Sequence, residues 1–243
     1  MTAVLAVFLS AALAALLALA GHAATPVLAL AVALVVVLVA IGWAVLMDLP
    51  DRRGTALVIA LTGWVSVGAA LLTRDALRPL AVFSGMIALA VLAAFGHELF
   101  RRGNRDRLVE SVSGTLVGQV VALLGSGWVL VPEQVLDGTV IPIAATALGA
   151  TRVLGLFPWP ARLAGWIPFL AGTAAGVAVG VVLGQGWQAP VAVAGAVAAV
   201  VAGMDRMLAA QPTARTPRGG LAGASAATAA VGAVTLAAAL LIG

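Results

Sequence analysis

Long apolar runs, separated by short polar segments, divide the chain into nine stretches of membrane-spanning length. A helix that crosses the hydrocarbon layer of a bilayer, about 30 Å thick, needs about 20 mainly apolar residues. We expect helices because the runs lack the alternation of apolar and polar residues of barrel strands, and because lipid offers backbone amides no partners. The predicted spans are residues 2–20, 26–47, 55–72, 79–98, 108–131, 139–157, 163–183, 188–207 and 220–242.

The first stretch also has the features of a cleaved signal peptide. Ala18-Leu19-Ala20 matches a small-x-small cleavage site ahead of Gly21. The residues before this site include no Lys or Arg, which a signal peptide normally has, and this favours a retained helix. The prediction is therefore an all-α, polytopic integral membrane helical bundle of about nine transmembrane helices, or eight if the first is cleaved, with residues 1–243 as a single transmembrane domain.

The composition agrees with this pattern. Hydrophobic residues make up 63% of the chain and charged residues 9%, and the mean hydropathy is +1.16. Such a chain has too little polar surface to cover a soluble globule, so its apolar surface is expected to face the lipid bilayer. The absence of Cys excludes disulfides, thiolate metal sites and cysteine nucleophiles.

Arginine is concentrated in every second loop. The loops after the second, fourth, sixth and eighth spans contain Arg52, Arg53, Arg101, Arg102, Arg105, Arg107, Arg162, Arg206, Arg215 and Arg218. The other loops contain only Arg74 and Arg78. The positive-inside rule then predicts a cell-membrane protein with a cytoplasmic amino terminus and an external carboxyl terminus. The rule also accounts for the net charge of +4, so we expect no nucleic-acid partner.

Glycines recur with a regular spacing at the predicted cytoplasmic ends of the even spans. Gly42, Gly96, Gly149 and Gly203 are 54, 53 and 54 residues apart. This indicates possible hairpin repeats over residues 1–53, 54–107, 108–162 and 163–218, followed by a terminal helix at 219–243. The same period also arises without duplication, because any pair of spans joined by short loops recurs at about this interval.

Small residues form strips at helical spacing, a pattern known as a glycine zipper. Such strips let helix backbones approach closely in lipid. They predict either internal packing in the carboxyl-terminal half or a face for a homo-oligomer or membrane complex. The strips are Gly172, Gly176, Gly180 and Gly184, then Gly114 with Gly118, then Gly195, Ala199 and Gly203. The bulky branched residues at 33–41 instead predict a lipid-facing second helix, and most tryptophans are predicted to anchor span ends at the interface.

Ionisable and polar side chains near the span ends are the candidate functional residues, because such groups are costly at membrane depth. Ser111, Thr115 and Gln119 follow one helix face, so they could form a hydrogen-bonding groove below a basic mouth suited to an anionic lipid headgroup or phosphate. The same residues are also typical of a solvated loop with snorkelling arginines and internal helix packing. The candidates are His97, Glu98, Arg101, Arg102, Glu110, Ser111, Thr115, Gln119, Arg152, Asp205 and Arg206.

Two segments are similar to motifs of CDP-diacylglycerol synthases. They are "ESVSGTLVG" at 110–118 and "GMDRML" at 203–208, in which Ser113, Gly114 and Thr115 match part of the family's Ser-Pro-Gly-Lys-Thr segment. The family's lysine, its Lys-Asp pair and its glycine-histidine run have no counterpart here, so the groups that hold metal and nucleotide in that family are missing.

The sequence therefore supports two classes of function. The first is a transporter-like or permease-like protein, or an accessory membrane subunit, with a polar cluster on the cytoplasmic side. Its transport version predicts a cavity that reaches Gln119 and Arg152. The alternative is a membrane enzyme acting on a lipid phosphate, which needs at least two of Glu98, Glu110 and Asp205 to converge. The chain lacks HExxH, GxSxG and P-loop motifs, and we expect no metal and no cofactor.

Overall fold

The computed structural model describes residues 3–73, 79–101, 107–131 and 138–242, and within these ranges the chain is helical without strands. Each of the nine predicted segments is helical. The elements are α1 (Ala3–Ala23), α2 (Thr25–Leu46), α3 (Arg52–Thr73), α4 (Pro79–Phe100), α5 (Leu108–Leu124), α6 (Gly127–Leu130), α7 (Val140–Leu154), α8 (Trp166–Val182), α9 (Gln188–Ala209), the 3₁₀ helix η3 (Pro212–Arg215) and α10 (Pro217–Ile242).

Seven helical segments of the described ranges are long and apolar enough to cross a membrane. One of them, Leu108–Leu130, joins α5 and α6 across a break at Gly125 and Ser126 that the hydropathy pattern did not predict. Two further helices, α7 with 15 residues and α8 with 17, are apolar but shorter. At 1.5 Å per residue, α7 is about 22 Å long, which is less than the hydrocarbon thickness.

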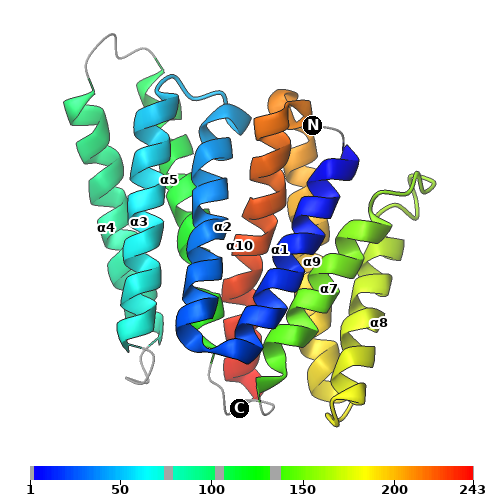
Figure 1. Cartoon of the computed structure of the whole chain (residues 1–243). Helices are drawn as coiled ribbons and strands as arrows, with labels where there is room; N and C mark the ends of the chain where they lie inside the picture. Colours follow the sequence, from blue (N-terminus) through cyan, green and yellow to red (C-terminus); the bar gives the residue numbers. More distant parts are fainter. Residues whose placement is uncertain (1–2, 74–78, 102–106, 132–137, 243) are drawn as a thin grey trace.

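The helices run side by side and form two outer groups around a central set (Figure 1). In one outer group α3, α4 and α5 contact one another, and in the other α7, α8 and α9 do so. The central set is α1, α2 and α10, and α10 contacts helices of both groups. The start of α1 lies at the same end of the bundle as the ends of α2, α4, α7 and α9, and α10 ends at the opposite end (Figure 1). We call the first of these the arginine-rich end, because Arg52, Arg53, Arg101, Arg107, Arg162, Arg206, Arg215 and Arg218 lie there.

The core is built on α10, whose small residues let neighbouring helices approach. A Cβ on Gly42 of α2 would come within 2.7 Å of the backbone of Ala222, and Gly127 of α6 lies against the backbone of Gly232. The prediction that the 33–41 stretch of α2 faces lipid is wrong for much of its length: Val36 and Val39 are fully buried against this core, whereas Leu34 and Ile41 are exposed. Branched side chains serve equally well against lipid and against other helices, so their bulk did not indicate direction.

The glycine strips divide between inside and outside. Gly172, Gly176 and Gly180 of α8 are buried, and a Cβ at Gly176 would meet Ala194 of α9 at 2.6 Å. A Cβ at Gly203 of α9 would meet no atom within 4 Å in the part of the chain that the structure describes. The α8 strip is thus internal packing, whereas the strip on α9 faces outward.

Two tryptophans that were predicted as interface anchors are instead buried, and each forms a hydrogen bond to another helix. Trp43 is 2% exposed and donates to the carbonyl of Gly114 at 2.9 Å, and Trp128 is 1% exposed and donates to the carbonyl of Thr228 at 2.9 Å. Each indole N–H is therefore satisfied inside the bundle, as burial requires. Trp166 and Trp187 are exposed at the starts of α8 and α9, which agrees with an anchoring role. Trp64 is exposed in the middle of α3 and donates to the carbonyl of Ala33 at 3.3 Å, so it does not mark a span end.

A ladder of polar side chains joins α3 to α5 and the residue before α6. The two helices run in the same direction, and three pairs follow one another along them. The pairs are Thr55 with Thr115 (3.3 Å), Thr62 with Gln119 (2.8 Å) and Ser66 with Ser126 (2.9 Å). The predicted Ser111, Thr115 and Gln119 stripe is thus used in helix packing, and Gln119 does not line the cavity described below.

Candidate functional site

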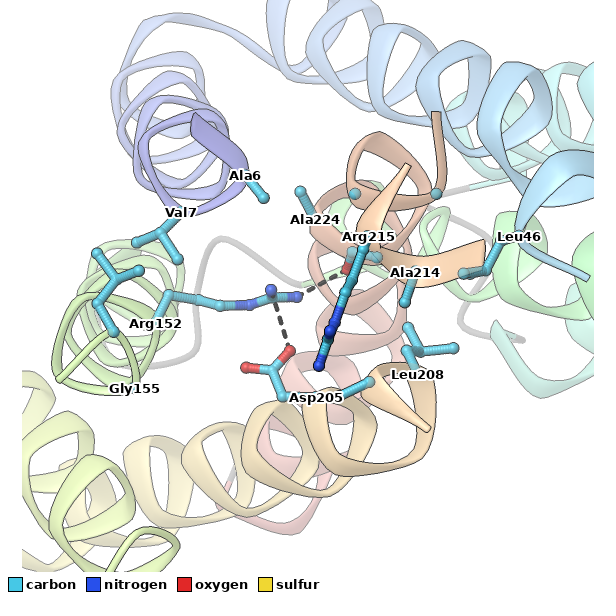
Figure 2. A pocket seen from close by; sticks show the side chains of 15 residues that line it. Ala6, Val7, Leu46, Arg152, Gly155, Asp205, Leu208, Ala214, Arg215 and Ala224 are labelled. Carbon is cyan, nitrogen blue, oxygen red and sulfur yellow. Dashed lines mark hydrogen bonds and ion pairs between the residues drawn. The ribbon is translucent and has the colours of Figure 1, made fainter. Parts of the chain in front are cut away.

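A pocket of about 600 Å³ opens at the arginine-rich end between α1, α2, α7, α9, η3 and α10. This volume lies in the range of small-molecule sites. Its walls are largely small and apolar, with Ala6 and Val7 from α1 and Leu46 from α2 among them. Three charged side chains line the pocket: Arg152 from α7, Asp205 from α9 and Arg215 from η3 (Figure 2).

Arg152 is the most deeply placed of these groups. Its side chain is 8% exposed, its Nη1 lies 3.0 Å from Oδ1 of Asp205, and its Nη2 donates to the carbonyl of Gly223 at 2.7 Å. Its Nε is buried without a hydrogen-bond partner among the described residues. The side chain extends into the pocket, and its guanidinium lies beside Asp205 (Figure 2). Because arginine stays charged in proteins, a full positive charge is held in this wall with donors to spare.

The local sequence explains this position. Arg152 lies in the last turn of α7, where Thr151 donates to the carbonyl of Ala147 at 2.7 Å and so uses its own hydroxyl within the helix. Gly172 of α8 packs directly against Thr151 on one side of α7. Gly223 has no side chain to cover its carbonyl, and it is this carbonyl that receives Arg152.

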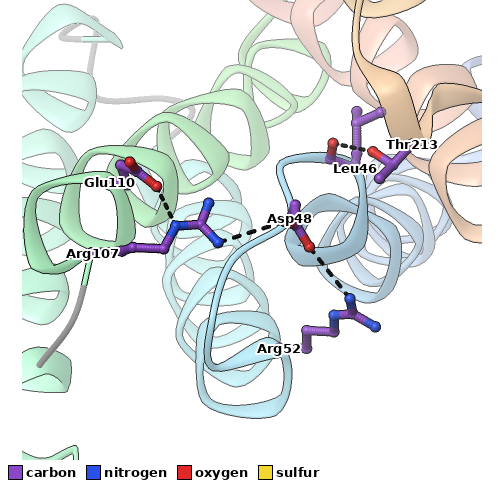
Figure 3. A network of polar contacts seen from close by, with 6 residues as sticks. All are labelled: Leu46, Asp48, Arg52, Arg107, Glu110 and Thr213. Carbon is purple, nitrogen blue, oxygen red and sulfur yellow. Dashed lines mark hydrogen bonds and ion pairs between the residues drawn. The ribbon is translucent and has the colours of Figure 1, made fainter. Parts of the chain in front are cut away.

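Arg215 reaches the pocket from the short segment between α9 and α10. The hydroxyl of Thr213 donates to the carbonyl of Leu46, which ties η3 to the end of α2 (Figure 3). The amide of Gly219 donates to the hydroxyl of Thr216 at 3.0 Å, and Gly219 lies directly against the carbonyl of Thr213. These contacts fix the segment over the pocket, and Arg215 points across it in the direction of Asp205 (Figure 2).

A second cluster, at the same end of the bundle, joins α3, α4 and α5. Glu98 is 4% exposed; its Oε2 lies 2.9 Å from Nε of Arg101, and its Oε1 accepts from the hydroxyl of Ser111. Nε2 of His97 lies 3.6 Å from Oδ2 of Asp51. The other carboxylate oxygen of Asp51 accepts from the amide of Gly54 at 2.9 Å, as an N-cap residue of α3 does.

A third set of charges lies outside these two, on the surface. Arg107 pairs with Glu110 and lies 3.5 Å from Asp48, which in turn lies 3.5 Å from Arg52 (Figure 3). The hydrogen bond and the charge of Glu110 raise the pKa of the Arg107 guanidinium above its ordinary value. All four side chains are well exposed, so their interactions are screened by solvent.

The balance of charge differs between these places. In the α3–α5 cluster and on the surface, each arginine described above has at least one carboxylate as a neighbour. Two arginines and one carboxylate, that of Asp205, are among the described residues that line the pocket, and Asp205 pairs with Arg152. Of these three groups, only the pocket has more arginines than carboxylates.

The structure separates the predicted candidates. Arg152 and Asp205 meet in the pocket, whereas His97, Glu98, Arg101 and Ser111 belong to the second cluster. Glu110 lies on the surface, and Arg206 packs over Gly165 at the start of α8. Arg102 lies outside the described residues. Glu98, Glu110 and Asp205 each pair with a different arginine.

Sequence reasoning missed Arg215 and Asp51. Both lie in short loops, where charged residues are usually solvated. A usable signal for Arg215 was its position between Pro212 and Pro217, which shortens and stiffens the connection between two spans. Nothing in the sequence marked the carbonyl of Gly223 as a partner of Arg152.

Among the described residues, no group of three His, Cys, Asp or Glu side chains is placed to hold a metal ion. Comparisons of the chain with models of known protein families, with curated proteins and with solved structures gave no match.

Proposed function

We propose that this chain is an integral membrane protein of the permease type that binds an anionic group in the Arg152 pocket, with the arginine-rich end in the cytoplasm. The seven apolar segments long enough to cross a bilayer support the membrane location. The distribution of arginine supports the orientation.

The observation that carries the proposal is that the guanidinium of Arg152 is buried and does not use all of its N–H donors. A charge at this depth is costly and is retained where it recognises a partner. Asp205 and the Gly223 carbonyl take two of its five N–H donors, and Arg215 adds a second positive charge to the same space. The anionic group could come from two sources, a lipid headgroup, for which the apolar walls would hold the start of the chains, or a soluble oxyanion.

Calorimetric titration of the purified chain in neutral detergent tests the proposal. Two probes are used, inorganic sulfate and dihexanoyl phosphatidylglycerol, because both keep their charge between pH 5 and 8. Arg152→Ala is expected to weaken binding of at least one probe by about 10- to 100-fold, since a hydrogen bond to a charged group contributes about 1.5–3 kcal/mol. Arg52→Ala is the matched control, because Arg52 lies at the same end but on the surface, with its side chain 56% exposed.

Equal affinity of the Arg152→Ala, Arg52→Ala and unmodified chains for both probes would overturn the proposal. A preference for the lipid probe indicates a headgroup site, and equal binding of both probes indicates a general oxyanion site. Size-exclusion elution and the tryptophan emission spectrum show whether each variant is folded. If Arg152→Ala fails to fold, Arg215→Ala is used in its place, because that residue is exposed and lies in a short connection.

An accessory-subunit role is the second candidate, supported by the outward strip on α9. Among the described residues, a Cβ added at Gly195 would meet only Thr173 of α8, at 3.9 Å, and a Cβ added at Gly203 would meet nothing within 4 Å. Such a strip suits close contact with another transmembrane helix. If the strip joins copies of this chain, Gly195→Leu is expected to convert an oligomer in detergent to a monomer, as measured by mass photometry. An unchanged particle mass would argue against self-association through α9.

A further inference from the structure

We propose that Asp205 is an internal ligand of Arg152, and that an anion displaces it as Asp205 takes up a proton, so that one anion and one proton enter the pocket together. This inference rests on the proposed anion-binding function. It adds the way in which binding is coupled to a second ion.

The contacts of Arg152 place Asp205 where an external anion would bind. The carboxylate of Asp205 lies 3.0 Å from Nη1, a distance expected for a charge-assisted contact. The guanidinium cannot readily move away, because its side chain is 8% exposed and its Nη2 is held by the carbonyl of Gly223. An oxyanion that approaches Nη1 therefore competes directly with Asp205.

Asp205 is the member of the ion pair that can be displaced. Its side chain is 34% exposed and lines the open pocket, so water reaches it and a changed rotamer has space. When its carboxylate accepts a proton from water, the ion pair with Arg152 is lost and Arg152 keeps its own charge. The released guanidinium then donates to the anion, and the exchange takes up one proton for each anion bound.

The charged groups around Asp205 support a one-to-one exchange. Arg152 faces it from α7, and Arg215 lines the same pocket from η3. α8 has no charged residue, and α10 contributes the Gly223 carbonyl to this contact, with Arg218 of its first turn exposed and outside the lining. On α9 itself, Arg206 packs over Gly165. Asp205 is thus the one carboxylate among the described residues that line the pocket.

The charges in the pocket couple the binding of the anion to the protonation of Asp205. With Asp205 ionised, the pocket has two positive charges and one negative, and a bound monoanion would share Nη1 with a like charge. With Asp205 protonated, the anion meets two arginines and no carboxylate. Anion affinity is therefore expected to rise as the pH falls through the range in which Asp205 protonates, by up to tenfold for each pH unit, which is the linkage for one proton.

The test measures affinity and proton uptake with the same two probes, sulfate and dihexanoyl phosphatidylglycerol, between pH 5 and 8. Proton uptake comes from titrations in two buffers with different enthalpies of ionisation. The unmodified chain is expected to take up close to one proton per anion at pH values where its affinity changes. Asp205→Asn, which keeps the shape but cannot ionise, is expected to bind more tightly at neutral pH, with no proton uptake and no dependence on pH.

Asp51→Asn is the matched control, because Asp51 is an aspartate of the other cluster, paired with His97. It should keep the pH dependence of the unmodified chain. Binding without proton uptake in the unmodified chain, or an unchanged pH dependence in Asp205→Asn, would overturn this inference and leave the anion site standing. Absence of binding of either probe to both chains at every pH would overturn the proposed function itself. If Asp205→Asn does not fold, the proton uptake of the unmodified chain decides.

Discussion

The chain contains two arginine–glutamate pairs of the same sequence spacing, one buried and one exposed, and their removal should have very different effects. Glu98 pairs with Arg101 at 4% and 9% side-chain exposure, whereas Glu110 pairs with Arg107 at 59% and 45%. Both are three-residue separations at the junction of α4 and α5. Burial is therefore the main variable between them.

The structure sets the expected magnitudes. Glu98→Ala leaves the guanidinium of Arg101 buried without its carboxylate and removes the acceptor of the Ser111 hydroxyl. Breaking a buried pair in this way costs about 3–5 kcal/mol. Glu110→Ala removes a solvent-screened contact with an exposed arginine, so its effect on stability should be far smaller.

Reversible unfolding in mixed micelles of increasing SDS content, followed by tryptophan emission, gives the free energy of unfolding for each variant. The double variant Glu98→Leu with Arg101→Leu removes both charges and should recover most of the stability lost in Glu98→Ala, because no unpaired charge is left. If Glu98→Ala costs no more than Glu110→Ala, the α3–α5 cluster is not the buried network described above.

Two further predictions follow from the packing and from the absence of cysteine. Gly232→Val should lower the free energy of unfolding by several kcal/mol, because a Cβ there would already lie 2.6 Å from Cδ1 of Trp128 and 2.7 Å from the carbonyl of Leu124. If the same SDS titration gives a stability within about 1 kcal/mol of the unmodified chain, the close contact of α6 with α10 is contradicted. Because the chain has no Cys, single cysteines report orientation: in intact cells an impermeant maleimide should label Gly186→Cys and not Ala210→Cys, and the reverse pattern would invert the proposed topology.

Hydropathy predicted the helices well because length and apolar content are local properties. The segments 79–98 and 188–207 became Pro79–Phe100 and Gln188–Ala209, within two residues at each end. The interruption at Gly125 and Ser126 was not visible, since it lies inside a continuous apolar run and depends on the approach of α10.

The sequence did not indicate which face of each helix points into the bundle and which points to lipid. In a membrane protein, both the lipid-facing and the inward-facing sides of a helix are apolar. Val36, Val39 and the indole of Trp43 therefore gave no indication of which way they face, and the structure shows that all three are buried. Their neighbours include small residues, Gly63 of α3 against Val36 and Gly118 of α5 against Trp43, and this pairing is set by tertiary contacts.

Two of the candidate residues lie together in the pocket, but the grouping of the candidates was not predicted. Arg152 and Asp205 were both expected to be functional because ionisable groups are rare at span ends, and the structure pairs them. Gln119 was expected to share their cavity, but its amide donates to Thr62 instead. Charge and spacing identify polar residues, whereas the choice between a packing contact and an open wall depends on the helix opposite.

The ladder between α3 and α5 has a consequence for the order of membrane insertion. Thr55 and Ser66 each find their partner 60 residues further along the chain, so α3 leaves the ribosome before those partners exist. At a synthesis rate of about 5–20 residues per second, the interval is about 3–12 s. During this time the hydroxyl of Thr62 can donate to the carbonyl of Val58 in its own helix, as it does in the folded chain. Thr62 can therefore satisfy its hydroxyl within α3 before α5 is inserted, whereas the amide of Gln119 on the later helix would be harder to accommodate in the bilayer alone.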